Sequence, residues 1–408
     1  MESNKLYFLD ANIHKWYRFV LSFPPHLVNE YLNKFNASEY SLVLDPFCGT
    51  GTTLVECKKN AIPSIGLEAN PMALFASQVK INWVIEPYEI IEIAKIIAEK
   101  ANSKIKNHKG KYLKLNHEQE KLLIKNSISP LPLHKSLILL DIINKYKENK
   151  NYNHLKLAFA KQLVNSYSNL HFGPEVGVSR NKKHDADVIN LWLTEVISMA
   201  HDIAQFKEKE NIYGEVLYTD SRNINLDKKV DIVFTSPPYP NEKDYTRTTR
   251  LESVVLGYIN NKEDLRRYKN NLLRSNTRNI YISDDDEKYI RNNKRIMNLS
   301  KAIENKRIEL GKTSGFEKYY HRVVELYFGG IYCHLMGLKK HLSHNAHLAY
   351  VVGDQASYFQ ILINTGEILA EIAEDIGYKV DTIDVFRTRL STKSGKYLNE
   401  EVVVLRNH

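Results

Sequence analysis

The first informative stretch of the chain reads Ser41-Leu-Val-Leu-Asp-Pro-Phe-Cys-Gly-Thr-Gly-Thr-Thr-Leu-Val-Glu-Cys57. A short apolar run leads into a glycine turn and then into apolar residues at helical spacing, which predicts a strand, a tight loop and a helix. A second strand is predicted for the run that starts at residue 62 and ends in Glu68, and a helix for residues 72–83. Two strands separated by a helix indicate the start of a parallel α/β sheet.

The rest of the chain alternates between helical and strand-like patterns. Between about 88 and 209, apolar residues recur at spacings of three and four residues, which is typical of helices. The segments are 89–105, 118–128, 133–146, 155–170 and 185–206, and the pattern returns from 241 to about 340. Strand-like runs lie at 214–220, 230–239, 347–354, 378–386 and 401–406. No linker or internal repeat separates these parts, so we predict one α/β sheet domain that carries two largely helical insertions.

The composition excludes several classes of protein. The chain has 408 residues, of which 43% are apolar, and its formal net charge is +9. No window approaches the ~18 apolar residues of a membrane span, and the first residues lack the apolar run of a signal peptide, so we expect a soluble, cytoplasmic protein without a membrane partner. The 15 histidines form no HxH or HxxxH pattern and the 3 cysteines no paired spacing, so we expect no metal.

The positive charge is concentrated in the two helical stretches. Residues 101–184 contain 16 Lys and Arg against 5 Asp and Glu, and residues 261–320 contain 15 against 9. The sheet domain is therefore net acidic. Clustered Lys and Arg suit a phosphate backbone, and we expect both insertions to contact a nucleic acid.

The glycine turn and the strand that follows it have the features of a cofactor site. Gly49 and Gly51 lack a Cβ, so a ligand can approach the backbone, and the next helix offers free N–H groups. The lysine of a phosphate-binding P-loop and the third glycine of a dinucleotide fingerprint are both absent. Glu68 lies 17 residues after Gly51, at a strand end where a carboxylate can accept both hydroxyls of a ribose.

A second motif, Thr235-Ser-Pro-Pro-Tyr-Pro240, ends the strand predicted for 230–239. Two consecutive prolines cannot continue a sheet and impose a stiff turn. The turn holds a hydroxyl, a carbonyl and the Tyr239 ring in fixed relation. An amino group needs acceptors for its protons and a planar base needs a stacking face, and this turn supplies both.

The two motifs, residues 45–52 and 235–239, resemble those of the amino-group DNA methyltransferases. These enzymes use S-adenosylmethionine and place an (Asp/Asn/Ser)-Pro-Pro-(Tyr/Phe) turn at the target base. Residues 14–28 are similar to the family's N-terminal segment that closes over the methionine end of the cofactor. The resemblance implies a Rossmann-like class I methyltransferase sheet of seven strands, mostly parallel with one antiparallel. It gives no match for the insertions.

The resemblance also implies residue roles. The backbone of 47–51 is expected to hold the methionine part of the cofactor, Glu68 the ribose and Asp220 the adenine amino group, while Ser236, the Pro237 carbonyl and Tyr239 hold a flipped cytosine. The set implied for the cofactor is Phe23, Pro24, Asp45, Pro46, Phe47, Cys48, Gly49, Thr50, Gly51, Thr52, Glu68, Ala69, Asp220 and Ser221, and the catalytic set is Ser236, Pro237, Pro238 and Tyr239.

The order of the motifs implies an organisation in five parts. Residues 1–87, 210–240 and 321–408 are expected to form the methyltransferase domain, with its cofactor-binding part first, and residues 88–209 and 241–320 to be inserted for DNA recognition. Too little chain follows the last strands for a separate recognition domain. The residues expected to contact DNA are Arg180, Lys182, Lys183, Tyr245, Arg247 and Arg250.

The expected activity is direct transfer of a methyl group from S-adenosylmethionine to the N4 amino group of a flipped cytosine in double-stranded DNA. Ser-Pro-Pro-Tyr is the form associated with cytosine, and no Pro-Cys nucleophile of ring-carbon enzymes is present. The expected context is bacterial or archaeal restriction–modification or a related system, with a restriction endonuclease as a possible partner. Three alternatives stay open: adenine N6, transfer RNA guanine N2, and a non-catalytic DNA-binding subunit.

Overall fold

The computed structural model describes residues 6, 10–18, 22–172, 175–390, 395 and 397–408. Its centre is a seven-stranded sheet with the order β5-β2-β1-β6-β7-β9-β8. The strands are β1 (Val43–Asp45), β2 (Ser64–Glu68), β5 (Gly214–Tyr218), β6 (Val230–Thr235), β7 (Leu342–Gly353), β8 (Tyr378–Leu390) and β9 (Tyr397–Asn407). Only β9 runs antiparallel to its neighbours β7 and β8. This confirms the predicted fold class.

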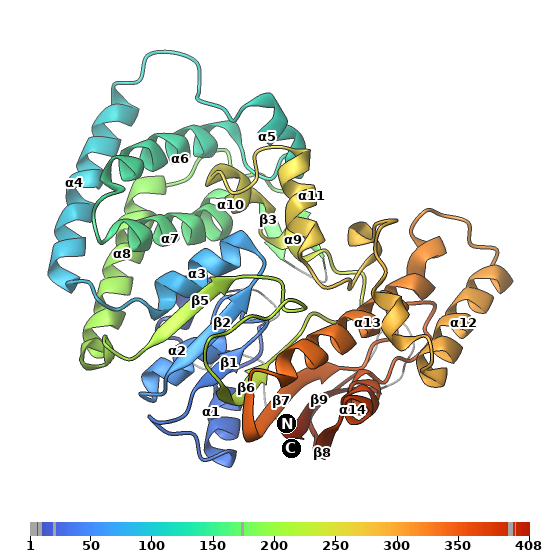
Figure 1. Ribbon diagram of the computed structural model, residues 1–408. Helices are drawn as coiled ribbons and strands as arrows, with labels where there is room; N and C mark the ends of the chain where they lie inside the picture. The colour runs from blue at the N-terminus through green and yellow to red at the C-terminus, as the bar shows by residue number, and fades with distance from the viewer. Residues whose placement is uncertain (1–5, 7–9, 19–21, 173–174, 391–394, 396) are drawn as a thin grey trace.

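Helices cover both faces of this sheet (Figure 1). The helices of the sheet domain are α1 (Pro25–Lys34), α2 (Thr52–Lys59), α3 (Pro71–Ile81), α13 (Tyr320–Lys339) and α14 (Thr365–Ile376). Val43 of β1 packs with α1, whereas its neighbour Leu44 packs with α13 and α14. Successive strand residues point to opposite faces, so β1 is apolar throughout because both of its faces are buried.

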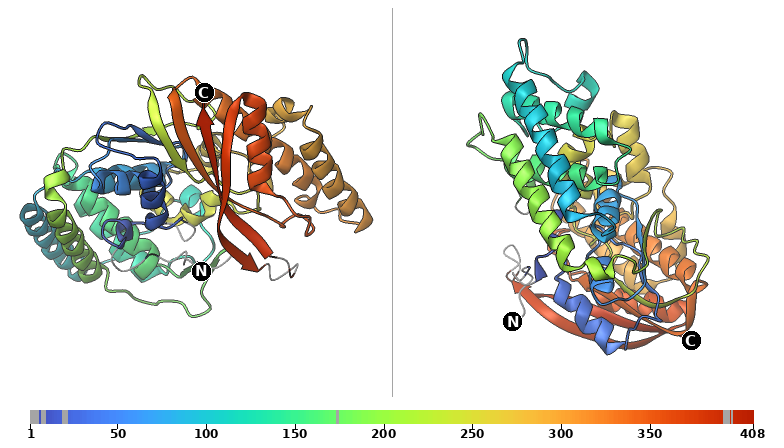
Figure 2. Two further views of the ribbon diagram at one scale, coloured as in Figure 1. Left: turned by 90° about the horizontal axis from the view of Figure 1, so that it is seen from below. Right: turned by 90° about the vertical axis from the view of Figure 1, so that its left-hand side faces the viewer.

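The first insertion packs onto the sheet domain through a continuous apolar core. Its helices are α4 (Pro87–Lys106), α5 (His117–Leu122), α6 (Pro130–Ile143), α7 (Tyr152–Gln162) and α8 (Val188–Gln205). Buried residues of α4, α6, α7 and α8 share one cluster with Leu54 of α2 and Met72 of α3, whereas Leu122 of α5 lies in a separate cluster. The views in Figure 2 show this group of helices on one side of the molecule and the C-terminal strands on the other.

Two helices of the first insertion are shorter than the sequence predicts. The segment 118–128 is helical only to Leu122, because Leu123 is extended and Asn126 takes a left-handed φ of 63°. The segment 155–170 leaves the α-helix at residue 162, passes through a π-turn (Leu163–Tyr167) and enters a small hairpin, β3 (Leu170–Phe172) and β4 (Val176–Val178). The insertion is therefore not wholly helical.

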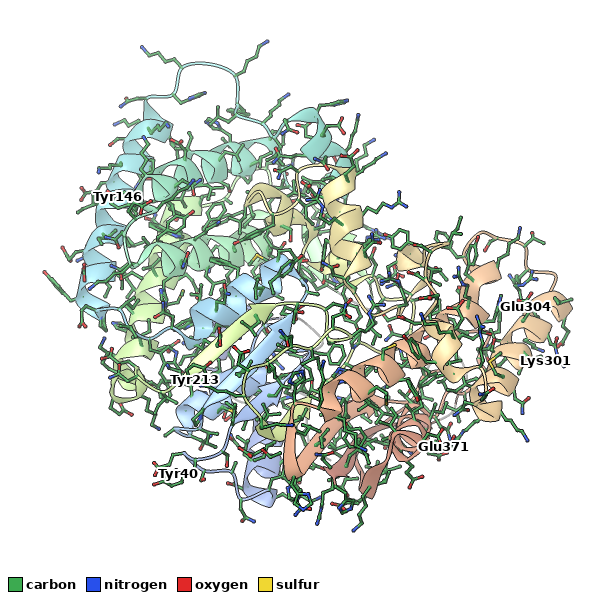
Figure 3. The ribbon with its side chains drawn as sticks, viewed as in Figure 1. Tyr40, Tyr146, Tyr213, Lys301, Glu304 and Glu371 are labelled. Atoms are coloured by element: carbon green, nitrogen blue, oxygen red, sulfur yellow. The ribbon has the colours of Figure 1, made fainter. Side chains whose placement is uncertain are left out.

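The buried apolar residues of the second insertion divide among three clusters, and Leu251 and Val255 of its helices join the core of the first insertion. Its first helices are α9 (Tyr245–Thr248), α10 (Arg250–Val255) and α11 (Lys262–Asn270), and Val254 and Tyr268 from these pack with Leu122 of the first insertion. Its last helix, α12 (Lys294–Glu309), packs instead with α13. Arg295 of α12 also pairs with Glu371 of α14, which Figure 3 labels. None of the described helices is long and apolar enough to cross a membrane.

Candidate active site

The two motifs meet because β1 and β6 are neighbours, paired at Val43 and Ile232. Both strands end at the same edge of the sheet, at the point where the strand order reverses. The Thr235 hydroxyl donates to Asp45 Oδ1 at 2.6 Å, and the same oxygen accepts from the Phe47 N–H at 3.1 Å. Asp45 is fully buried, and burial raises the pKa of its carboxyl to about 6. Asp45 thus joins the glycine loop to the strand that carries the Ser-Pro-Pro-Tyr turn.

The glycine loop is fixed to the end of β2. Gly49 and Gly51 have φ values of 51° and 80°, a left-handed conformation that favours glycine. The Gly49 N–H donates to Glu68 Oε2 at 2.7 Å and the Asn70 N–H to Glu68 Oε1 at 2.6 Å. Desolvation raises the pKa of the Glu68 carboxyl to about 7. Phe47, Gly49 and Glu68 are partly exposed, so they form the surface of the loop that a ligand can touch.

Most of the remaining residues expected around the cofactor are buried. They lie in the packing between the loop, α2 and β2, or at the start of α1. They are Pro24, Pro46, Cys48, Thr50, Gly51, Thr52 and Ala69. Phe23 is partly exposed and packs edge to face on Phe234 of β6, with ring centroids 5.5 Å apart. Residues 19–21 of the same N-terminal segment lie outside the described residues.

A buried lysine that the sequence motifs do not indicate connects the N-terminal segment to the glycine loop. Lys80 of α3 is fully buried, and its ammonium donates to the Thr50 carbonyl at 2.7 Å and to the Tyr17 carbonyl at 3.2 Å. Burial and, to a smaller extent, the nearby positive charge of Arg18 together lower the pKa of Lys80 to about 7. The one signal in the sequence is a charged residue in an otherwise apolar helix.

Asp220, the residue expected at the adenine, is held by an arginine. Arg222 Nη2 donates to Asp220 Oδ2 at 2.6 Å and Arg222 Nε to Asp220 Oδ1 at 3.0 Å. Arg222 Nη1 also donates to Asp286 in the second insertion, at 2.6 Å. The carboxylate of Asp220 is therefore fixed in orientation beside the end of β5.

His334 of α13 ties the adjacent Ser221 to the sheet. A carbonyl only accepts, so the 2.9 Å contact to the Ser221 carbonyl places the proton on His334 Nδ1. His334 Nε2 then accepts from the Tyr350 hydroxyl at 2.7 Å. Burial lowers the pKa of His334 to about 4, which keeps the ring neutral. The ring of Phe47 contacts it with centroids 4.9 Å apart. No local sequence pattern points to His334.

The Ser-Pro-Pro-Tyr turn leaves β6 beside the end of β7. The Ser236 hydroxyl donates to the Val351 carbonyl at 3.0 Å. Because the Ser236 hydroxyl uses its only proton in this bond, its oxygen can act only as an acceptor toward other groups. The Tyr239 ring is partly exposed and lies against Gly353, where an added Cβ would come within 3.1 Å of ring atom Cε2. Burial raises the pKa of the Tyr239 hydroxyl, so it stays protonated.

The chain after the turn is held by a distant segment. Glu242 has a left-handed φ of 64°, which is strained for a residue with a side chain. Its carboxylate accepts from the Thr277 N–H at 2.9 Å and from the Thr277 hydroxyl at 2.7 Å. Asn241 N–H also donates to the Ser275 carbonyl at 3.1 Å. Residues 275–277 of the second insertion thus fix the exit of the turn.

The residues expected to contact DNA lie in two places. Arg180, Lys182 and Lys183 follow the β3–β4 hairpin, where Arg180 and Lys183 are exposed and the Lys183 ammonium donates to the Ser166 carbonyl at 2.8 Å. The other three, which are Tyr245, Arg247 and Arg250, follow the Ser-Pro-Pro-Tyr turn, and the Tyr239 N–H donates to the Tyr245 hydroxyl at 3.5 Å.

The hairpin approaches the turn from the first insertion. Burial raises the pKa of Glu242, and the negative charge of Glu175 at the hairpin raises it further. Glu175 therefore lies within electrostatic range of the chain that leaves the turn.

The chain is similar to several known methyltransferases. A family model described as DNA methylase, of the N6/N4 type, matches residues 10–78. The chain is similar to the type II methyltransferase M.BsoBI of Geobacillus stearothermophilus, with 27% identity over 95% of this chain and 83% of that protein. It is also similar to the type II methyltransferase M.AvaI of Nostoc sp., with 23% identity over 92% of this chain and 81% of that protein. Among solved structures, TrmN from Thermus thermophilus aligns with a TM-score of 0.33 and 11% identity, over 98% of this chain and 53% of that one.

Proposed function

The chain belongs to the N6/N4 amino-group DNA methylase family, and on this premise we propose that it methylates the N4 amino group of cytosine in duplex DNA. The methyl donor is S-adenosylmethionine, which supplies an electrophilic methyl group on a sulfonium. The base is flipped out of the duplex, because an amino group inside the stack cannot reach a donor held at the sheet edge. The proposed biological setting is a type II restriction–modification system with a matching endonuclease as partner.

The observation that carries the proposal is the orientation of the Ser236 hydroxyl. An exocyclic amine is a poor nucleophile because its lone pair is delocalised into the ring, so the site has to supply acceptors for its protons. Ser236 donates its proton to the Val351 carbonyl, so its oxygen can only accept; of its two lone pairs, one faces the neighbouring Tyr239 hydroxyl and one is left for an incoming amine. The Pro237 carbonyl is the proposed second acceptor, and the partly exposed Tyr239 ring the stacking face.

The residues around the glycine loop fit the proposed cofactor. Each oxygen of Glu68 accepts one backbone N–H, so each has a second lone pair for a ribose hydroxyl. Three donors of Arg222 make four contacts with Asp220, and the single Nε proton is shared between Oδ1 at 3.0 Å and Oδ2 at 3.1 Å, so the adenine amino group would take the position that this shared proton only partly fills. Phe47 and Gly49 provide the exposed surface for the methionine part.

We assign DNA contact to the two insertions. They hold the clusters of Lys and Arg and flank the Ser-Pro-Pro-Tyr turn, with the β3–β4 hairpin on one side and residues 275–278 on the other. The proposed contacts are Arg180, Lys182, Lys183, Tyr245, Arg247 and Arg250.

The test is to incubate the protein with isotope-labelled S-adenosylmethionine and mixed-sequence duplex DNA, and to identify the methylated nucleoside by mass spectrometry. We expect label in N4-methylcytosine. Label in N6-methyladenine would change the base, label only in a parallel transfer RNA reaction would change the substrate class, and no label in any reaction would contradict the proposal. The Tyr239→Ala variant, purified in the same way, controls for a contaminating methylase.

A further inference from the structure

A charged pocket lies where the two insertions meet, next to the Ser-Pro-Pro-Tyr turn. Its volume is about 240 Å³, and residues 122–124 of the first insertion form one wall. The charged residues that line it are Asp244, Arg247, Arg250, Lys269 and Arg278, all from the second insertion. Figure 1 shows the elements that surround it, α5, α9, α10 and α11, converging above the sheet.

The positive charge of this pocket is not balanced by the protein. Four cationic side chains face one carboxylate, Asp244, which Lys269 already contacts at 3.1 Å. Arg250 donates only to neutral groups, among them the Thr246 hydroxyl at 2.7 Å and the Leu122 carbonyl at 3.4 Å. Within the part of the chain that the structure describes, neither Arg247 nor Arg278 forms an ion pair within 4.0 Å, although the charge of Arg278 is close enough to Glu242 to offset part of the rise that burial causes in the pKa of its carboxyl.

The cations of the pocket also repel one another. Burial lowers the pKa of Lys269, the charge and hydrogen bond of Asp244 raise it, and the positive charges of Arg250 and Arg278 lower it again. Leucine side chains line the pocket as well, so the charges interact in a medium less polarisable than water. An anion inside the pocket would relieve this repulsion.

The position of the pocket relative to the turn is fixed by hydrogen bonds. Asp244 is five residues from Tyr239, and Arg278 follows the segment 275–277 that holds Asn241 and Glu242. The side chain of Asn276 donates to the Lys243 carbonyl at 3.0 Å. A nucleotide whose base lies on the turn would therefore bring its backbone close to the pocket.

We infer that this pocket binds one backbone phosphodiester of the DNA strand that carries the target base, with Arg247 and Arg278 as its ligands. Guanidinium groups match phosphate oxygens in a bidentate manner, and Arg250 and Lys269 add positive charge behind them. The inference rests on the proposed function, because it assumes that the turn receives a base from DNA.

The first experiment compares Arg247→Gln and Arg278→Gln with Lys379→Gln. Lys379 lies on β8 of the sheet domain, its side chain is 54% exposed and it pairs with Asp381 at 3.5 Å, so its variant removes one positive charge outside both the pocket and the insertions. The probe is a fluorescent 30-base-pair duplex that contains a site mapped from DNA methylated by the wild-type protein. We expect each pocket variant to lower the slope of log Kd against log salt by about one and the control to leave it unchanged. Equal slopes for pocket variants and control would overturn the inference.

The second experiment locates the phosphate. Single phosphates around the target base are replaced one at a time by uncharged methylphosphonates. At one position, wild type should lose about tenfold in affinity while Arg247→Gln loses no more, because the interaction is already absent. Full additivity of the variant and every replacement would overturn the inference. A wild type that methylates no DNA would instead contradict the proposed function, and calorimetry with S-adenosylmethionine should give unchanged affinity for all three variants.

Discussion

The two halves of the candidate active site are held in place in different ways. The glycine loop is fixed by residues of its own motif and of the next strand, with Asp45 binding Phe47 and Glu68 binding Gly49. The Ser-Pro-Pro-Tyr turn is fixed from far along the chain: Ser236 contacts Val351, 115 residues away, and Glu242 contacts Thr277, 35 residues away. The loop thus carries its own support, whereas the turn takes its support from β7 and the second insertion. Changes on each side should therefore have separable effects.

Tyr239→Ala should separate the base side from the cofactor side most clearly. Loss of the stacking face should lower turnover about 100-fold or more, whereas the affinity for S-adenosylmethionine should stay within a factor of two. Methyl transfer to DNA and calorimetry with the cofactor measure the two quantities. Tyr239→Phe keeps the ring and is the matched control. An equal loss in both quantities for Tyr239→Ala would refute its place at the base.

Glu68→Gln tests the cofactor side through pH. The pKa of Glu68 is about 7, and its ionised form is the better acceptor for ribose hydroxyls. Wild-type affinity for S-adenosylmethionine should therefore rise as pH increases from 6 to 8, and the variant should bind about tenfold more weakly at pH 8 but nearly equally at pH 6. Calorimetry at three pH values measures this.

Because the variant retains the cofactor's own titration, the difference between the two profiles reports Glu68 alone. Parallel profiles would exclude a role for its charge.

Thr235→Val should affect both sides at once, because the Thr235 hydroxyl joins them through Asp45. The variant removes one donor from the buried Asp45 carboxylate, which keeps the Phe47 N–H, so the free energy of unfolding should fall by about 1–3 kcal/mol. Urea denaturation measures the change. Thr235→Ser retains the hydroxyl and should lose less than half as much. Identical stabilities of the two variants would mean that the hydrogen bond contributes nothing.

Gly353→Ala should give the smallest effect and should confine it to the base side. The new Cβ would lie 3.1 Å from Tyr239 Cε2, so the ring has to shift slightly. A displaced rotamer costs about 0.5–1.5 kcal/mol, which corresponds to a roughly two- to tenfold loss of turnover. Cofactor affinity should not change. A loss of cofactor affinity would show that the two sides are more tightly coupled than their hydrogen bonds indicate.

The difference between short-range and long-range support also explains which features could be predicted from the sequence. The sheet, its seven strands and the position of the glycine loop follow from local apolar patterns and from residues that support each other at short range. The predicted C-terminal ends of the helices at 118–128 and 155–170 were wrong, because the left-handed Asn126 and the π-turn at 163–167 are set by tertiary packing. Lys80 and His334 could not be found, since each acts on partners that are distant in sequence. The link that Arg222 makes from the neighbouring Asp220 to Asp286 also depends on a distant partner.

The way the second insertion is split has a consequence for how target specificity can change. Leu122 of the first insertion is buried against Val254, Ile259 and Tyr268 of the second. A chimera that receives residues 88–209 from a relative would keep one half of this apolar contact and replace the other. On the proposed function, in which both insertions contact DNA, exchange of one insertion alone would therefore not transfer target specificity. The two segments have to be inherited or transplanted together.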